Sequence, residues 1–208
     1  TPAGRSLQIV DLPGTYSLRA RSPDEEITRD AVLGQLRGEA APDLIVCVAD
    51  ASNLRLALRL ALELKRVGRP VVLSLNMMDI ARKRGIEIDA GRLARELGLP
   101  VVSSVAVRRG GADALLSEID RTFAGLPMAG ISSWSAPGAG ELRNTQREAD
   151  RLLAAAVRGS GERDAGTARI DSILLHPVAG LVILLAILFV MFQAVFAWAE
   201  PAMNAIEA

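Results

Sequence analysis

An aspartate and a glycine, separated by two residues, follow the first apolar segment of the chain in the run Asp11-Leu12-Pro13-Gly14. A carboxylate at this place can hold Mg²⁺ through a bound water, and a glycine lets its backbone N–H approach a phosphate oxygen. The pair therefore indicates nucleotide chemistry. Taken alone, the motif fits an ordinary turn with Asp11 as a helix cap more often than it fits a nucleotide site.

A second polar pair follows a later apolar segment, in Asn76-Met77-Met78-Asp79. An Asn and an Asp at this spacing can face one planar base, and the carboxylate can accept hydrogen bonds from the ring N–H and the exocyclic amino group of guanine. Adenine does not present these donors, so the group would select the purine. Capping of a helix by Asn or Asp is an equally good explanation of this motif alone.

A third loop contains the small residues Val105-Ala106-Val107, directly after Ser103-Ser104. Its free backbone N–H groups could cover a base. By itself this loop indicates nothing about function.

The elements that must position these loops alternate between strand and helix. Apolar, β-branched runs predict strands at 6–11, 44–49, 71–75 and 101–105, and helical spacing of apolar residues predicts helices at 22–38, 54–67, 90–97 and 112–123. Continuously apolar strands joined by helices indicate an α/β fold with a doubly wound, mostly parallel sheet. Ligands of such sheets bind at the carboxyl ends of the strands, where all three loops lie.

The rest of the chain differs in composition. Gly, Pro and Ser interrupt residues 125–140, which we interpret as a linker, and a further helix is predicted at 141–157. Residues 178–199 have Gln193 as their only strongly polar side chain and are long enough to cross about 30 Å of hydrocarbon. The alternative is a buried helix of a soluble protein. Arginines before the run and glutamates after it favour a cytoplasmic location for the preceding residues.

Composition excludes several classes of function. The formal net charge is +0 and only 3% of the residues are aromatic, so the chain has neither the charge nor the stacking surface expected of a nucleic-acid-binding protein. The single cysteine, Cys47, excludes an internal disulfide and a cysteine-based zinc site.

The motifs together resemble the ferrous iron transport protein B (FeoB) family. The run from Asp11 to Leu18, followed by Ser22-Pro23-Asp24-Glu25-Glu26, is similar to its G3 and switch II region, and Asn76 to Asp79 is similar to its G4 motif. Residues 170–180 are similar to the segment that leads into the first membrane helix of the family. The resemblance implies a small G domain, followed by a helical spacer and one transmembrane α-helix.

The resemblance also assigns roles to residues. Asp11 would join the Mg²⁺ water shell, Gly14 would donate to the γ-phosphate, Asn76 and Asp79 would hold guanine, and Met77 would cover the base. Val105-Ala106-Val107 would form the G5 loop, although Val105 replaces the usual Ser and removes its hydroxyl contact. The complete set of expected GTP-binding residues is Asp11, Leu12, Pro13, Gly14, Asn76, Met77, Met78, Asp79, Val105, Ala106 and Val107.

No G-x-x-x-x-G-K-[ST] phosphate loop occurs in the sequence. We therefore expect this chain to be a piece of a larger protein, and we expect the piece to begin after the phosphate loop of that protein. Strands ending at Asp11 and Ala49 should then have open edges, and the isolated chain should be unstable. The expected domains are a partial G domain at 1–124, a linker and helical spacer at 125–169, and the membrane segment at 170–208. Thr15 stands where Ras-like proteins carry the glutamine that orients water, and no catalytic residue is assigned.

The function implied by the resemblance is GTP binding and hydrolysis in the cytosolic part of an inner-membrane transporter, with the nucleotide state gating Fe²⁺ uptake. GTP or GDP and Mg²⁺ would be the ligands and Fe²⁺ the transported ion. The expected partners are the lipid bilayer, small Feo accessory proteins and further copies of the chain, without nucleic acid. Two alternatives are a membrane-tethered regulatory GTPase without transport and a degenerate, non-catalytic scaffold.

Overall fold

The computed structural model describes residues 1–125, 134–159 and 172–207, and side chains in the last range up to Val195. The chain forms two compact units, Thr1–Gly161 and Glu162–Ala208. The strands of the first unit are β1 (Ile45–Asp50), β2 (Val71–Asn76), β3 (Glu87–Ile88), β4 (Val101–Ser103) and β5 (Val157–Arg158). Its helices are α1 (Pro23–Leu33), α2 (Leu54–Val67), α3 (Met78–Lys83), α4 (Ala90–Leu97), α5 (Asp113–Gly125) and α6 (Ala139–Ala156).

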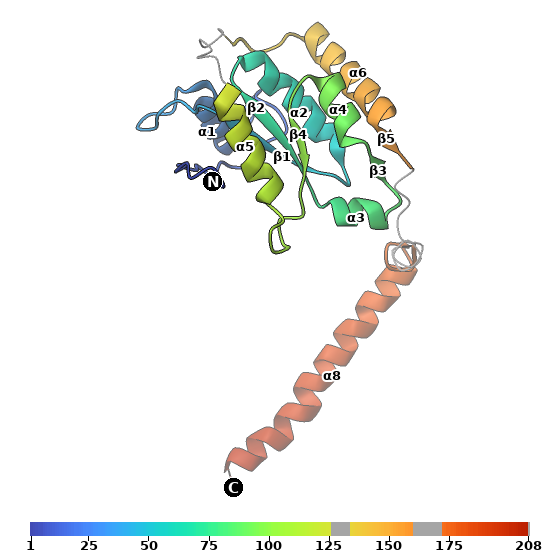
Figure 1. Cartoon of the computed structure of the whole chain (residues 1–208). Helices are drawn as coiled ribbons and strands as arrows, with labels where there is room; N and C mark the ends of the chain where they lie inside the picture. The colour runs from blue at the N-terminus through green and yellow to red at the C-terminus, as the bar shows by residue number, and fades with distance from the viewer. Residues whose placement is uncertain (126–133, 160–171, 208) are drawn as a thin grey trace. The chain divides into compact units, whose positions relative to one another are not determined.

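A parallel sheet of order β1-β2-β4 forms the centre of the first unit. Cys47 lies opposite Leu73, and Leu73 lies opposite Val101. In Figure 1, α5 lies on the opposite side of this sheet from α2 and α4. The central strand β2 is buried from Val71 to Leu75 because helices cover both of its faces. The predicted α/β class with a parallel sheet is therefore confirmed.

Helix α6 packs on α2 and α4 and contributes to the same core as the sheet. Its side chains of Ala149, Leu152 and Ala156 are buried in the main hydrophobic cluster. Arg151 joins α6 to α4 through a 2.8 Å ion pair with Glu96. The helix that follows the predicted linker is thus part of the first compact unit.

The strand predicted at 6–11 is not formed, and this prediction was wrong. The segment is irregular, with Ile9 81% and Val10 50% exposed. A strand needs a hydrogen-bonded neighbour, and within the described residues 6–11 has none. Among the described residues, strand β1 pairs only with β2, so its other edge is open there, as expected for the strand ending at Ala49. On β1, Val46 and Val48 are exposed.

Several elements differ from the sequence prediction. Helix α1 ends at Leu33 instead of near Gly38, because Gly34 adopts a left-handed φ of 73° and closes the helix. Arg69 stabilises this end by donating to the carbonyls of Val32, Leu33 and Pro42 at 2.9, 3.2 and 2.9 Å. Helix α3 and the short antiparallel ribbon of β3 and β5 were not predicted.

The second unit contains α8 (Ala179–Glu207). His176 caps its start, because its Nδ1 atom accepts hydrogen bonds from the backbone N–H groups of Val178 and Ala179, both at 3.3 Å. Large apolar side chains such as Leu181 and Phe189 are exposed on α8. Among the helical residues that the structure describes, none forms a stretch both long and apolar enough to cross a membrane. The predicted span at 178–199 extends past Val195, beyond the described side chains.

Candidate functional site

The carboxyl ends of β1, β2 and β4 lie at one edge of the sheet because the strands are parallel and in register. Asn76 is the last residue of β2, opposite Asp50 at the end of β1. The loop after β4 contains Val105, Ala106 and Val107. Two of the three predicted loops therefore meet at this edge, from positions about 30 residues apart in the chain.

The side chain of Asn76 connects these two loops. Its Oδ1 atom accepts a hydrogen bond from the backbone N–H of Ala106 at 3.1 Å. Its backbone carbonyl accepts a second bond from Ala51 N–H at 2.9 Å, which ties the end of β2 to the end of β1. Asn76 thus joins the loop after β4 to the carboxyl ends of β1 and β2.

Asp79 lies in the first turn of α3, where the helix dipole favours a carboxylate. Its side chain is 28% exposed and lies 3.8 Å from the guanidinium of Arg108, which belongs to the loop after β4. The Arg108 side chain is 68% exposed, so this long ion pair is weak. This geometry suits a carboxylate that accepts N–H donors from a base.

The two methionines between Asn76 and Asp79 point to different environments. Met77 has a left-handed backbone, with φ of 60°, and its side chain is 43% exposed at the candidate site. Met78 is 6% exposed and belongs to the hydrophobic core. Met77 is therefore available to cover a bound base, whereas Met78 fixes the start of α3 by packing.

Serine hydroxyls and a glycine support the loop after β4. Ser104 donates its backbone N–H to the carbonyl of Leu75 at 2.7 Å, and its hydroxyl lies 3.1 Å from that of Ser74. A Cβ atom at Gly111 would overlap the backbone carbonyl of Val105, so only glycine fits there. Val107 is 93% exposed and makes no contribution to the core.

The loop Asp11-Leu12-Pro13-Gly14 is held in place by its own contacts with helix α1 and the core. Thr28 of α1, itself buried, donates its hydroxyl to the carbonyl of Pro13 at 2.7 Å, and Leu12 packs against the core. Asp11 and Gly14 are exposed. Among the described residues, no hydrogen bond or ion pair joins this loop to Asn76 or Asp79, so the structure does not bring all three predicted loops together directly.

The donor set at Asp11 fits Mg²⁺ only in combination with a nucleotide. Within the described residues, no group of three or more His, Cys, Asp and Glu side chains could hold a metal ion. Mg²⁺ is commonly bound by one or two carboxylates together with phosphate oxygens and waters. Asp11 alone matches such a partial, water-mediated role.

Sequence reasoning missed Glu63, which is 1% exposed on α2. Its carboxylate accepts hydrogen bonds from Leu18 N–H at 2.7 Å and from the Ser17 hydroxyl at 2.9 Å. The available signal was a charged residue inside the apolar face of a predicted helix. Cys47 behaves as the sequence predicts: it is packed in the core, and burial raises the pKa of its thiol to about 12.

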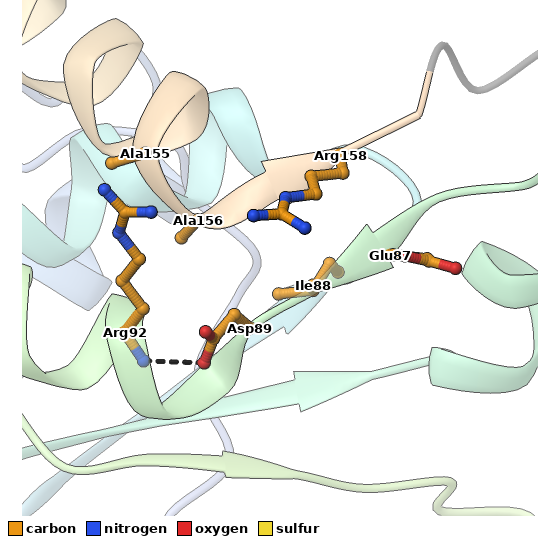
Figure 2. Close-up of a pocket in the computed structure, with 7 residues that line it drawn as sticks. All are labelled: Glu87, Ile88, Asp89, Arg92, Ala155, Ala156 and Arg158. Carbon is orange, nitrogen blue, oxygen red and sulfur yellow. Dashed lines mark hydrogen bonds between the residues drawn. The ribbon is translucent and has the colours of Figure 1, made fainter.

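A separate hollow lies where the β3–β5 ribbon meets α4 and α6 (Figure 2). Its volume is about 240 Å³, and Asp89 at its side caps α4 by accepting from Arg92 N–H at 2.8 Å. None of the predicted GTP-binding residues lines it; its walls are Glu87, Ile88, Asp89, Arg92, Ala155, Ala156 and Arg158. The hollow therefore gives no support to the nucleotide prediction.

Solved structures similar to this chain include the cytosolic domain of the T. maritima FeoB iron transporter in GMPPNP form. The two are 25% identical with a TM-score of 0.59, over 72% of this chain and 80% of that one. The FeoB G-domain from Methanococcus jannaschii is 41% identical with a TM-score of 0.51, over 55% of this chain and 70% of that one. These similarities identify the first unit as a G-domain-like α/β fold.

Curated relatives agree with the structural comparison. The Fe(2+) transporter FeoB of Campylobacter jejuni is 32% identical over 96% of this chain, and that of Salmonella typhimurium is 45% identical over 54%. The chain spans 32% and 14% of the length of these two relatives. The family description "Ferrous iron transport protein B" matches residues 1–119. Since this match covers more than half of the 208 residues, the chain belongs to the ferrous iron transport protein B family.

Proposed function

We propose that this chain supplies the guanine-recognising part of a GTP-hydrolysing switch that gates Fe²⁺ passage through a membrane transporter. The observation that carries the proposal is the bond that Ala106 N–H donates to Asn76 Oδ1, because it joins the loop at 105–107 to the end of β2, three residues before Asp79. Asp79 would accept from the N–H donors of guanine, Asn76 would hold the loop, and Met77 would cover the base.

At the phosphate end, Gly14 would donate its exposed backbone N–H to the γ-phosphate, with Leu12 and Pro13 shaping the loop. When bound, Mg²⁺ would neutralise phosphate charge, and Asp11 would hold one of its waters. Thr15 donates its hydroxyl to the carbonyl of Ser17 at 2.7 Å, so this hydroxyl is already engaged in the loop. We propose no catalytic base among the described residues.

The test is titration calorimetry with a GTP analogue and an ATP analogue, on the longest open reading frame that contains this chain. We expect binding of the GTP analogue alone. Asp79→Ala should lower its affinity by about 10- to 100-fold, since a buried base N–H donor without an acceptor costs about 1–3 kcal/mol. Equal binding of both analogues, or indifference to Asp79→Ala, would exclude guanine recognition by this site.

Two variants of Asn76 test whether its side-chain oxygen is needed to hold the loop at 105–107. Asn76→Asp keeps an oxygen that can accept from Ala106 N–H, whereas Asn76→Ala removes it. We expect the Asp variant to retain more affinity than the Ala variant. Glu118→Gln, on α5, changes one carboxylate outside the candidate site and serves as the control.

We further propose that residues 178–199 insert into the bilayer and make the G domain the cytosolic part of an inner-membrane protein. The support is the apolar composition of this run and the exposed apolar side chains of α8, such as Leu181 and Leu185. Leu185→Arg, near the centre of the run, should reduce membrane integration, because Arg costs about 2.5–3.5 kcal/mol there. Extraction of the unsubstituted chain from membranes by alkaline carbonate would argue against insertion.

Fe²⁺ gating is tested by uptake of the isotope in cells that express the complete reading frame. Asp79→Ala should abolish GTP-dependent uptake, while Glu118→Gln should not. Loss of nucleotide binding without any change in uptake would exclude gating by the nucleotide. Absence of Fe²⁺ uptake by the complete reading frame would favour a membrane-tethered regulatory GTPase. We also propose small Feo accessory proteins and further copies of the chain as partners, on the family resemblance alone.

A further inference from the structure

A buried carboxylate connects helix α2 to the segment that follows Gly14. Glu63 lies on α2 between buried apolar residues such as Ala61 and Leu64, and only 1% of its surface is exposed. Burial of a carboxylate is costly unless hydrogen bonds replace its hydration. The groups that donate to Glu63 therefore decide what this carboxylate holds in place.

In the part of the chain that the structure describes, the hydrogen-bond partners of Glu63 belong to the segment after Gly14. Oε2 accepts from Leu18 N–H at 2.7 Å and from the Ser17 hydroxyl at 2.9 Å, and Oε1 lies 3.1 Å from the same hydroxyl. Ser17 in turn accepts the Thr15 hydroxyl at its carbonyl at 2.7 Å, and the Leu18 side chain is buried in the core. Glu63 therefore fixes residues 15–18 to α2.

Gly14 lies between two fixed points. On one side Thr28 of α1 holds the Pro13 carbonyl, and on the other Glu63 of α2 holds Ser17 and Leu18. Gly14 itself is exposed, and a Cβ atom there would meet nothing within 4 Å. The peptide that would meet a phosphate is thus uncovered, while its flanks are anchored to two different helices.

We propose that Glu63 is a positioning residue, whose carboxylate orients the Gly14 peptide for an incoming γ-phosphate. This inference rests on the proposed guanine-nucleotide function. The γ-phosphate is present in GTP and absent from GDP, so loss of the anchor weakens GTP binding and leaves GDP binding nearly unchanged. A carboxylate that only stabilised the fold would affect both nucleotides equally.

The experiment measures the affinities of a GTP analogue and of GDP for the longest open reading frame that contains this chain. Glu63→Leu places an apolar side chain on the apolar helix face. It should raise the dissociation constant of the GTP analogue, divided by that of GDP, by about tenfold, because the buried Leu18 N–H loses its acceptor. Glu63→Gln retains an oxygen that can accept from Leu18 N–H, so its ratio should stay close to that of the unsubstituted protein. Glu148→Gln, on the surface of α6, is the matched control and should leave it unchanged.

Ser17→Ala serves as a second variant in case Glu63→Leu fails to fold. It removes the hydroxyl that donates to Glu63 and that also accepts from Arg19 N–H at 3.1 Å, and it should raise the ratio by about threefold. An unchanged ratio in folded Glu63→Leu, or in Ser17→Ala if the former does not fold, overturns the positioning role while guanine binding stands. Absence of guanine-nucleotide binding in the unsubstituted protein overturns both the proposed function and this inference.

Discussion

Replacement of Leu152 by alanine tests whether helix α6 belongs to the core of the first unit. Leu152 is 0% exposed and lies in the main hydrophobic cluster, on the helix that packs on α2 and α4. The substitution removes three carbon atoms, which at about 0.8 kcal/mol each gives about 2.4 kcal/mol for transfer alone. The cavity that remains adds to this cost, so we expect a loss of about 3–4 kcal/mol in the free energy of unfolding.

Urea unfolding followed by the fluorescence of Trp134 measures this loss. Trp134 is partly buried against the core cluster, shortly before α6 begins. Replacing the other tryptophan, Trp198, by phenylalanine makes Trp134 the single reporter. With a slope of about 1–3 kcal/mol per molar urea, the midpoint should fall by at least about 1 M, provided that the slope itself does not change.

Leu153→Ala is the matched control, since Leu153 lies on the same helix and is only partly buried. It should cost about 1 kcal/mol or less. Equal losses in the two variants, or a loss below about 1 kcal/mol for Leu152→Ala, would refute the packing argument. In that case residues 125–169 would behave as the separate spacer that the sequence suggested.

Three further outcomes are expected. The thiol of Cys47 should react with Ellman's reagent only as the chain unfolds, because burial blocks access and raises the pKa of the thiol to about 12; rapid labelling under native conditions would contradict this. Gly111→Ala should weaken guanine binding at least threefold by displacing the Val105 carbonyl, as nucleotide titration would measure. The Arg151 hydrogen bond lowers the pKa of Glu148, so its stabilising effect is present above the ordinary pKa of the carboxyl and is lost as pH falls through the lowered value. The stability difference between the unsubstituted chain and Glu148→Gln should therefore shrink as the pH falls below the ordinary pKa of the carboxyl, and a constant difference would show that the pair does not contribute.

Local sequence patterns were sufficient to predict where the main helices and the strands β1 and β2 lie in the chain. Apolar spacing predicts helices at 54–67 and 90–97, and α2 and α4 have these bounds. Gly68 and Gly98 end them in the left-handed conformation that glycine adopts without strain. The predicted and observed bounds of the first two sheet strands differ by one residue, because continuous β-branched runs identify buried parallel strands.

The candidate site was only partly predictable. Residue types and their positions after strands were enough to propose Asn76, Asp79 and the loop at 105–107 as one group. The bond that Ala106 N–H donates to Asn76 Oδ1 joins that loop to Asn76, and nucleotide binding by the group stays a prediction. The sequence could not show that Met78 packs in the core while Met77 is exposed. The two residues are of the same type, and only the fold decides which of the two side chains points into the core.

By itself, the sequence determined the alternation of helices and strands, the parallel sheet and the family to which the chain belongs, because these depend on local periodicity and motif spacing. Only the tertiary structure decided that residues 6–11 do not form a strand, that α6 joins the core, and that Glu63 anchors Leu18 across 45 positions. Each of these depends on a neighbour distant in the chain: a strand forms only beside a partner, and a buried carboxylate is stable only where N–H and O–H groups reach it.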